Sequence, residues 1–288
     1  MIKTSELPNI TGFKKTDGFV VDASTGTGRL TGDNAAEFMK EYFLQGGVPY
    51  GKELTESWAS LNGRIRAGDF TGIHIGDFKT ITLTTGEVVI MEAAGIDQYY
   101  KCGDSAIGHH VDFISRDCLV GSRRMNAANN NNGTASEKHP WLASELYRNL
   151  NDETTGIFSK LPGDLKPYII TKRAYLEERY SSGGAVAADT GWNWKNMGKL
   201  WLPTEVEVFG RYIYGTGGGC NLQYPIFMGG AKHIIKGSGN GGSRCYWWEV
   251  CAHRGTATYF CGIDYYGCAN YIDANHTGIG APLCFRIG

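Results

Sequence analysis

The sequence predicts an α+β protein of short mixed or antiparallel strands with one or two helices, preceded by a small N-terminal segment. Two features of composition point to it. Glycine makes up 41 of the 288 residues, roughly twice its usual share of about 7%, and aromatic residues reach 12% while charged residues stay at 20%. In addition, β-rich runs alternate with Gly-containing turns from Gly68 onward, which is typical of a sheet protein and not of a helical bundle.

The first 70 residues are expected to hold a strand and two helices. FVV is a short apolar run early in the chain, and AAEFMKEYFL follows the N-cap candidates Asp33 and Asn34. Within residues 47–70, four apolar side chains recur at the spacing of one helix face: Leu54, Trp58, Leu61 and Ile65. We therefore divide the chain into an N-terminal segment at 1–46, a helical linker at 47–70 and a main domain at 71–288.

The main domain is expected to begin with three strands, in KTITL, EVVIMEAAG and VDFISRDCLV. The asparagine-rich stretch at 126–133 predicts a surface loop, and WLASELYRNLND, with leucines four residues apart, predicts one helix. LPTEVEVFG predicts a turn into a short helical segment. Short Gly- and Tyr-rich strands follow, in which Trp247 and Trp248 alternate, so one is expected to be buried and the other to face outward.

Charge and hydropathy exclude several classes of partner. The 28 Lys and Arg residues nearly balance the 29 Asp and Glu residues, so the sequence gives no electrostatic reason to expect nucleic acid or an anionic membrane as a partner. The N-terminal residues lack the apolar core of an export signal, and no run approaches 18 apolar residues. We therefore expect synthesis in a reducing cytosol and no membrane insertion.

Motifs of catalysis and cofactor binding give no support for an enzyme. GSGNGG at 237–242 matches the glycine pattern of dinucleotide-binding loops, but strand-like residues follow it where a helix N-terminus would have to hold the pyrophosphate. It therefore predicts a flexible turn. GxxxxGK[ST], HExxH and GxSxG do not occur in the sequence, so we expect no enzymatic activity and no cofactor.

Six of the eight cysteines lie in the last 69 residues. Structural zinc sites use close cysteine pairs, and none is formed by Cys245, Cys251, Cys261 and Cys268. We therefore expect no metal. His109, His110 and Asp112 are expected to be hydrogen-bonded residues at the start of a strand and not metal ligands. Cys251 with His253 offers a thiol and a base, but no third group that would orient them is evident.

The composition of the chain changes at Gly237. All 24 Lys, Met and Gln residues lie before this position, although their frequency there predicts about five among the last 52 residues. Cys, Tyr, Asp, Asn, His, Ala, Gly and Ile stand in their place, and asparagine codons reach this set through changes of adenine. The break predicts a variable region at 236–288, shaped by adenine-directed mutagenesis, with exposed, unpaired cysteines.

Several motifs follow in order from about residue 70 to 288: GDFKTITL with VVIMEAAGID, HHVDFIS, WLASELYRNLN, LPTEVEVFG, and finally YWW, YFCGI and APLCFRI. Together they resemble the C-type-lectin-fold receptor-binding and variable proteins of phages and of diversity-generating retroelements. One departure is Trp248-Glu249-Val250-Cys251, where the family commonly has Trp-Leu-Arg-Ser. DGFVVDASTGTGRLTGDNAAEFM also resembles the attachment segments that open many phage fibre and tail proteins.

The resemblance implies a C-type-lectin-like domain whose final strands form a platform for a ligand. It implies a virion adhesin on a tail, baseplate or head fibre, assembled in the host cytoplasm as a homotrimer and docked on other virion proteins through residues 1–46. Its partner would be a host-surface receptor, either protein or glycan, contacted by Tyr, Asp, Asn and His side chains as in binding loops. The candidate receptor-binding residues are Tyr246, Trp248, His253, Arg254, Tyr259, Asp264, Tyr265, Tyr266, Asn270, Tyr271, Asp273, Asn275 and His276. The candidate scaffold residues are Trp247, Phe260, Ile263, Pro282 and Phe285.

The sequence leaves two other functions open. An enzyme on the related formylglycine-generating fold would use paired cysteines with copper or oxygen, and it predicts two close, redox-active thiols in a pocket. A structural head or tail decoration protein would bind no receptor, and the candidate residues would then be solvated turn residues.

Overall fold

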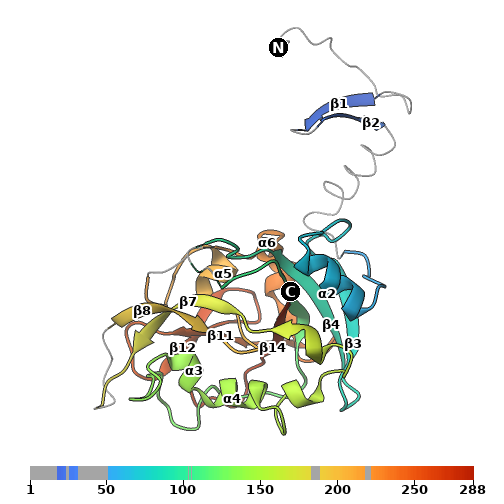
Figure 1. Ribbon diagram of the computed structural model, residues 1–288. Helices are drawn as coiled ribbons and strands as arrows, with labels where there is room; N and C mark the ends of the chain where they lie inside the picture. Colours follow the sequence, from blue (N-terminus) through green and yellow to red (C-terminus); the bar gives the residue numbers. More distant parts are fainter. Residues whose placement is uncertain are drawn as a thin grey trace. The chain divides into compact units, whose positions relative to one another are not determined.

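The computed structural model describes residues 18–23, 26–31, 51–102, 104, 106–182, 189–217 and 222–288. The chain divides into two compact units, residues 1–49 and 50–288 (Figure 1). In the first unit, strand β1 (Gly18–Ala23) pairs antiparallel with β2 (Gly26–Thr31), which confirms the strand predicted in FVV. The helix predicted in AAEFMKEYFL lies outside the described residues.

The second unit is an α+β structure with mostly antiparallel sheets and few helices, as predicted. Its five-stranded sheet has the order β3 (Phe78–Thr82), β4 (Val88–Ile96), β5 (Val111–Cys118), β14 (Pro282–Ile287) and β6 (Ile169–Ile170). A three-stranded sheet has the order β11 (Trp247–Ala252), β12 (Tyr259–Ile263) and β13 (Ala269–Asp273). Two further antiparallel pairs join β7 (Arg173–Arg179) to β8 (Asp189–Asn196) and β9 (Lys236–Gly237) to β10 (Arg244–Cys245).

The helices of this unit are short. They are α2 (Trp58–Arg66), α3 (Pro140–Ala143), α4 (Glu145–Asn151), α5 (Glu205–Phe209), α6 (Pro225–Met228) and α7 (Ala231–Ile234), with 3₁₀ turns η2 (Phe158–Lys160) and η3 (Lys166–Tyr168). The helix predicted around Leu54–Ile65 is confirmed as α2, which begins after the N-cap Ser57. The short helix predicted in LPTEVEVFG is confirmed as α5, where Thr204 and Glu207 form a capping box.

The single helix predicted in WLASELYRNLND is wrong, because the chain forms α3 and α4 with a break between them. Ser144 takes an extended conformation with φ −72° and ψ 156°. Its hydroxyl accepts the N–H of Tyr147 at 3.0 Å, so it caps α4 and does not continue α3. Serine favours this position because its side chain competes with the helical backbone for hydrogen bonds.

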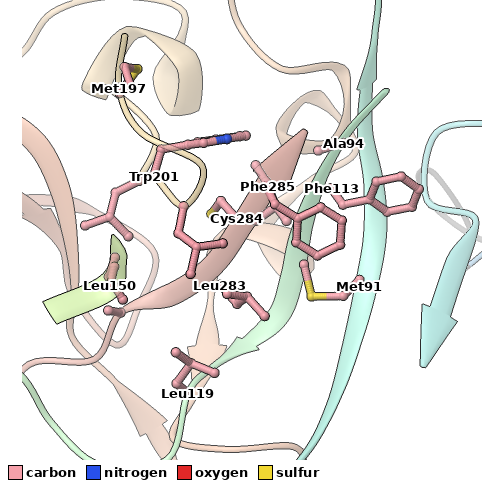
Figure 2. Close-up of a cluster of buried hydrophobic side chains, with 14 of the residues drawn as sticks. Met91, Ala94, Phe113, Leu119, Leu150, Met197, Trp201, Leu283, Cys284 and Phe285 are labelled. Carbon is pink, nitrogen blue, oxygen red and sulfur yellow. The ribbon is translucent and has the colours of Figure 1, made fainter. Parts of the chain in front are cut away.

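Strand β14 is an inner strand of the five-stranded sheet, between β5 and the edge strand β6, and all six of its residues are buried. Figure 2 shows Phe285 of β14 beside Phe113 of β5 in the hydrophobic core. The two residues are paired in register and their rings stack at 5.6 Å. Trp58 of α2 meets Phe113 at 5.6 Å and Phe285 at 5.8 Å, edge to face, so α2 covers this face of the sheet.

A buried polar network lies on the other face, because side chains alternate along β14. The Arg286 guanidinium donates to both carboxylate oxygens of Asp112, at 2.6 and 2.7 Å, and the Tyr224 hydroxyl donates to the same carboxylate at 2.7 Å. Burial alone would raise the pKa of Asp112, but the charge and hydrogen bonds of Arg286, together with the charges of His110 and Lys172, hold the pKa below its ordinary value. The prediction of hydrogen-bonded residues at this strand start is confirmed, since His110 also contacts the Gln98 carbonyl at 2.6 Å.

GSGNGG connects β9 to β10 and is the turn that the sequence predicted. Gly237 pairs with Arg244 across it, and no helix follows. Gly239 and Gly241 have φ of 76° and 72°, values that favour glycine. The dinucleotide interpretation therefore has no helix N-terminus on which to place a phosphate.

Candidate functional site

The three-stranded sheet β11–β12–β13 brings several of the predicted receptor-binding residues together. Strand β12 lies in the middle, with Tyr259 opposite Asp273 and Cys261 opposite Tyr271 on β13. Alternate residues of a strand share a face, so these four side chains lie on the same side of the sheet. His253 follows β11 directly, and its N–H donates to the Tyr259 carbonyl at 2.9 Å. The ends of the strands therefore carry a group of aromatic rings.

We define the aromatic patch as Tyr214, His253, Tyr259 and Tyr271. The ring of Tyr271 is central to it. Its centroid lies 4.9 Å from that of His253, 5.0 Å from Tyr214 and 5.1 Å from Tyr259. These separations are typical of interacting aromatic pairs. Tyr271 is 43% exposed, so the patch presents an aromatic surface to solvent.

Buried polar side chains hold the turn that carries the patch. The Asn131 side-chain amide donates to the carbonyls of Tyr259, Thr256 and His253 at 2.6, 2.8 and 3.3 Å. Arg179 donates to the same His253 carbonyl at 2.9 Å, and both Asn131 and Arg179 are fully buried. The turn is thus fixed from within the protein before any ligand binds.

The segment that carries Tyr214 is held by a carboxylate. Glu205 of α5 accepts the backbone N–H groups of Ile213, Tyr214 and Gly215 at 2.7 to 3.1 Å. The Tyr214 carbonyl in turn accepts the N–H of Arg254 at 3.0 Å. Tyr214 is therefore held between α5 and the turn after β11.

The imidazole of His253 is a neutral group in this setting. Partial burial, and then the positive charges of Arg179 and Arg254, lower the pKa of His253 below its ordinary value. Its Nδ1 accepts the N–H of Gly255 at 3.0 Å, as a neutral ring can. The patch thus combines three phenols and a neutral imidazole beside the exposed Arg254.

A second group of tyrosines, the tyrosine tip, consists of Tyr246, Tyr265 and Tyr266. The ring of Tyr265 lies 5.2 Å from that of Tyr246 and 4.3 Å from that of Tyr266, which is 64% exposed. Asp264 accepts the N–H groups of Tyr266 and Cys268 at 2.8 and 2.9 Å and so shapes the turn. The tip lies beyond the end of β12 opposite to Tyr259, and the strand itself spans about 13 Å from Tyr259 to Ile263 at the rise of a β-strand.

A surface groove of about 590 Å³ lies beside α4. Its lining includes Arg123, Arg124, Arg148 and Glu145, and the guanidinium of Arg124 already pairs with Glu145 at 3.1 Å. Thr277 is the one lining residue that belongs to the predicted variable region. The groove is therefore a weaker candidate than the aromatic patch for a site formed by that region.

No family model, no curated protein and no solved structure matches this chain. Among the described residues, no helix is long and apolar enough to cross a membrane. What the site can do must therefore be argued from its own residues.

The predicted receptor-binding residues differ in their exposure. The exposed ones are Arg254, Tyr265, Tyr266, Tyr271, Asn275 and His276. The half-buried ones are Tyr246, His253, Tyr259, Asp264, Asn270 and Asp273. Trp248 is completely buried. The predicted scaffold residues, Trp247, Phe260, Ile263, Pro282 and Phe285, are all buried as expected.

The prediction that one of the two adjacent tryptophans faces outward is wrong. Trp247 donates its indole N–H to the Ile234 carbonyl at 2.9 Å, and Trp248 donates to the Arg123 carbonyl at 2.7 Å. The two side chains point to opposite faces of β11, as alternation requires. Both are buried because other segments cover both faces, and Trp248 cannot contact a receptor in this structure.

The prediction of exposed cysteines is also wrong for most of those that the structure describes. Within residues 236–288, Cys261 and Cys284 are buried, and Cys245 and Cys251 are half-buried; before that region, Cys118 is buried and Cys102 is half-buried. Cys268 alone in this described set is exposed. The cysteines therefore do not mark a free surface, and several of them belong to the core.

Four residues of the site were not predicted, among them Glu205, which holds the backbone of Tyr214. Tyr214 comes from a segment before the composition break, and Asn131 and Arg179 act on the patch only through backbone carbonyls. The stretch at 126–133 was predicted to be a surface loop, but Asn131 is fully buried and Asn132 is 7% exposed. The run of asparagines was the available signal, since asparagine amides can bond several carbonyls of a turn.

Proposed function

We propose that this chain is a virion adhesin with a C-type-lectin-like domain, and that the aromatic patch and the tyrosine tip bind a receptor on the host surface. The same proposal makes it a homotrimer that docks on other virion proteins through residues 1–46. The α+β architecture, with a sheet made of late strands, supports the domain assignment.

One observation carries the proposal: exposed tyrosines lie beside or within turns that side-chain hydrogen bonds hold in place. Tyr271 of β13 packs against the turn that Asn131 and Arg179 fix, and Tyr266 lies in the turn that Asp264 shapes. Tyr271 and Tyr266 are 43% and 64% exposed, although large apolar side chains are usually buried. Tyrosine offers a large contact area and a hydroxyl at a small cost in conformational entropy. The hydrogen bonds of Asn131 and Arg179 reduce the ordering that binding would otherwise require.

A binding experiment with side-chain variants tests the proposal. Deletion of the last strands would remove the buried Trp247 and Trp248 and unfold the domain, so single substitutions are the better probes. Labelled protein is offered to a panel of bacterial cells and to an array of immobilised glycans. Tyr271→Ala and Tyr266→Ala are each expected to weaken binding about 30-fold, as a strong interface residue does.

Met228→Ala is the matched control, because Met228 of α6 is 64% exposed and lies outside the patch and the tip. It is expected to bind like the unchanged protein. Binding to cells but not to glycans would identify a protein receptor. If no surface binds the protein, the chain is better described as a decoration protein. If a surface binds it and both tyrosine variants bind normally, the aromatic patch and the tyrosine tip are not the receptor site.

The oligomeric state is tested separately by light scattering on the purified protein. A homotrimer has three times the chain mass of 31.5 kDa. A monomer at the concentration of the binding assay would contradict this part of the proposal and leave the receptor site untouched.

One observation favours the alternative of a cysteine enzyme. The thiol of Cys118 is hydrogen-bonded to Cys245, and this bond lowers the pKa of Cys245. Cys118 is buried, however, and the nearest cavity that it lines has a volume of about 10 Å³, too small for a substrate. Alkylation of the native protein tests the alternative, which requires Cys245 to react faster than the exposed Cys268.

A further inference from the structure

Two carboxylates and a thiol meet beneath the aromatic patch. Glu205 of α5, Glu249 of β11 and Cys261 of β12 are all fully buried. Each offers one ligand atom, and these atoms lie within 4.8 Å of one another. β11 and β12 are neighbouring strands, whereas α5 comes much earlier in the chain, so the fold brings Glu205 to the other two groups.

Glu249 has no partner at this position. Neither of its carboxylate oxygens has a hydrogen bond anywhere in the part of the chain that the structure describes. Glu207, by contrast, is buried nearby and accepts from Lys172 at 2.6 Å and from the Tyr99 hydroxyl at 2.9 Å. Buried charges are normally paired or bound to a metal. Glu207 has a cation and a hydrogen-bond donor as partners, and Glu249 has neither among the described residues.

A proton alone does not satisfy this site. Burial, followed by the charges of Glu205 and Glu207, raises the pKa of Glu249 well above its ordinary value. A protonated Glu249 would remove the repulsion, but its C=O group would still need a donor, and no described residue donates to either oxygen of this side chain. A cation bound by the carboxylate would satisfy the charge and the oxygen lone pairs together.

The chemistry of the three ligands selects the kind of cation. A thiolate with two carboxylates suits Zn²⁺ and related ions, whereas Ca²⁺ and Mg²⁺ take oxygen ligands. Around a tetrahedral zinc ion, with bonds of about 2.0 Å to oxygen and 2.3 Å to sulfur, neighbouring ligand atoms stand about 3.3–3.5 Å apart. The ligand atoms of the three side chains lie no more than 4.8 Å apart here, so small movements of these side chains would bring them to the spacing of a zinc site.

A further thiol and a small cavity lie close to Glu205. The Cys251 thiol accepts the N–H of Glu205 at 3.4 Å, so it lies beside the cluster. Thr204, Val250 and Cys251 line a cavity of about 20 Å³, which is the size of one water molecule. Cys251 does not belong to the group of atoms within 4.8 Å, and none of the three ligands lines this cavity, so a bound water molecule is left as the fourth ligand of a four-coordinate site.

We propose that Glu205, Glu249 and Cys261 bind a divalent zinc-class metal ion at a structural site beneath the aromatic patch. The ion links α5 to β11 and β12. Glu205 also holds the backbone of Tyr214, and Cys261 lies opposite Tyr271, so the site fastens two rings of the patch to the core. The proposal concerns the stability of the domain and does not depend on the receptor function.

Metal content and cobalt spectroscopy test it on the full chain. Protein purified under reducing conditions without chelator is expected to hold one zinc ion by mass spectrometry of its metals. Replacement by Co²⁺ is expected to give a sulfur-to-cobalt charge-transfer band in the near-ultraviolet. Cys261→Ser should abolish the band, and Glu249→Gln should weaken Co²⁺ binding about 100-fold, at least as much as the loss of an outer-shell partner does.

Cys268→Ser and Glu153→Gln are the matched controls, since Cys268 and the Glu153 side chain are exposed. Both should keep the band and the affinity. If the ligand variants fail to fold, thermal unfolding of the unchanged protein tests the proposal. The unchanged protein should have a higher melting temperature with Zn²⁺ than with chelator. Protein that binds neither ion, or a cobalt band that survives in Cys261→Ser, would overturn the assignment.

Discussion

Protonation of one buried histidine is expected to control the acid stability of the domain. His139 is the N-cap of α3 and is 4% exposed. Its Nδ1 accepts the N–H groups of Trp141 and Leu142 at 3.1 and 3.4 Å, which a neutral ring can do and a protonated ring cannot. Burial, helped by the charge of Lys195, lowers the pKa of His139 from 6.5 to about 3.

The direction and size of the effect follow from this pKa. The unfolded chain binds a proton at His139 below pH 6.5, whereas the folded protein does not until about pH 3. The stabilisation is therefore complete above pH 6.5 and is lost as the pH falls toward 3. The loss is about 0.8 kcal/mol at pH 6 and about 2 kcal/mol at pH 5, from 1.36 kcal/mol for each pKa unit.

Urea denaturation of the unchanged protein and of His139→Asn at pH 7.5, 6 and 5 measures this loss. Asparagine is also a good N-cap and does not titrate in this range. Between pH 7.5 and 5 the unchanged protein should lose about 2 kcal/mol more than the variant. His276→Asn, at an exposed histidine, is the control and should follow the unchanged protein. Parallel curves for His139→Asn and the unchanged protein would refute the reasoning, because the folded protein would then take up the proton.

Three further outcomes are expected. Asp112→Asn leaves the Arg286 charge buried without its partner and should cost about 3–5 kcal/mol in the free energy of unfolding, whereas Arg124→Ala at an exposed pair should cost no more than about 1 kcal/mol. Trp248→Ala should cost about 3–5 kcal/mol by chemical denaturation, while an unchanged stability would mean that the side chain is not buried. Thiol titration of the native protein should modify Cys268 quickly and the buried cysteines only after unfolding, and equal rates at all sites would contradict their burial.

Signals within a few residues predicted most secondary structure correctly. The apolar spacing from Leu54 to Ile65 and the Thr204 cap both act inside one element, so the sequence alone was sufficient for α2 and α5. Ser144 shows the limit of such signals. The leucine spacing continues across Ser144. Two helices form because the Ser144 hydroxyl accepts the N–H of Tyr147 and so caps a second helix.

Burial by a distant segment could not be predicted in this way. Alternation correctly placed Trp247 and Trp248 on opposite faces, but it does not reveal that the segment at Arg123 covers the second face. For the same reason the sequence predicted Tyr259 and Tyr271 of the patch but not Asn131 and Arg179, which hold its turn. Asn131 meets His253 and Tyr259 only because the fold brings distant parts of the chain together.

The position of β14 also has a consequence for the synthesis of the protein. The N–H of Leu283 donates to Ser115 of β5, which is 168 residues earlier in the chain. Until the ribosome has made β14, β5 has an unpaired edge, which exposes the nascent chain to aggregation. A stop codon or frameshift between residues 119 and 281 removes the strand that closes the sheet. A chain that folds has therefore kept its reading frame through residues 236–281, so folding itself would remove frame-shifted copies of the region that the composition break predicts to be variable.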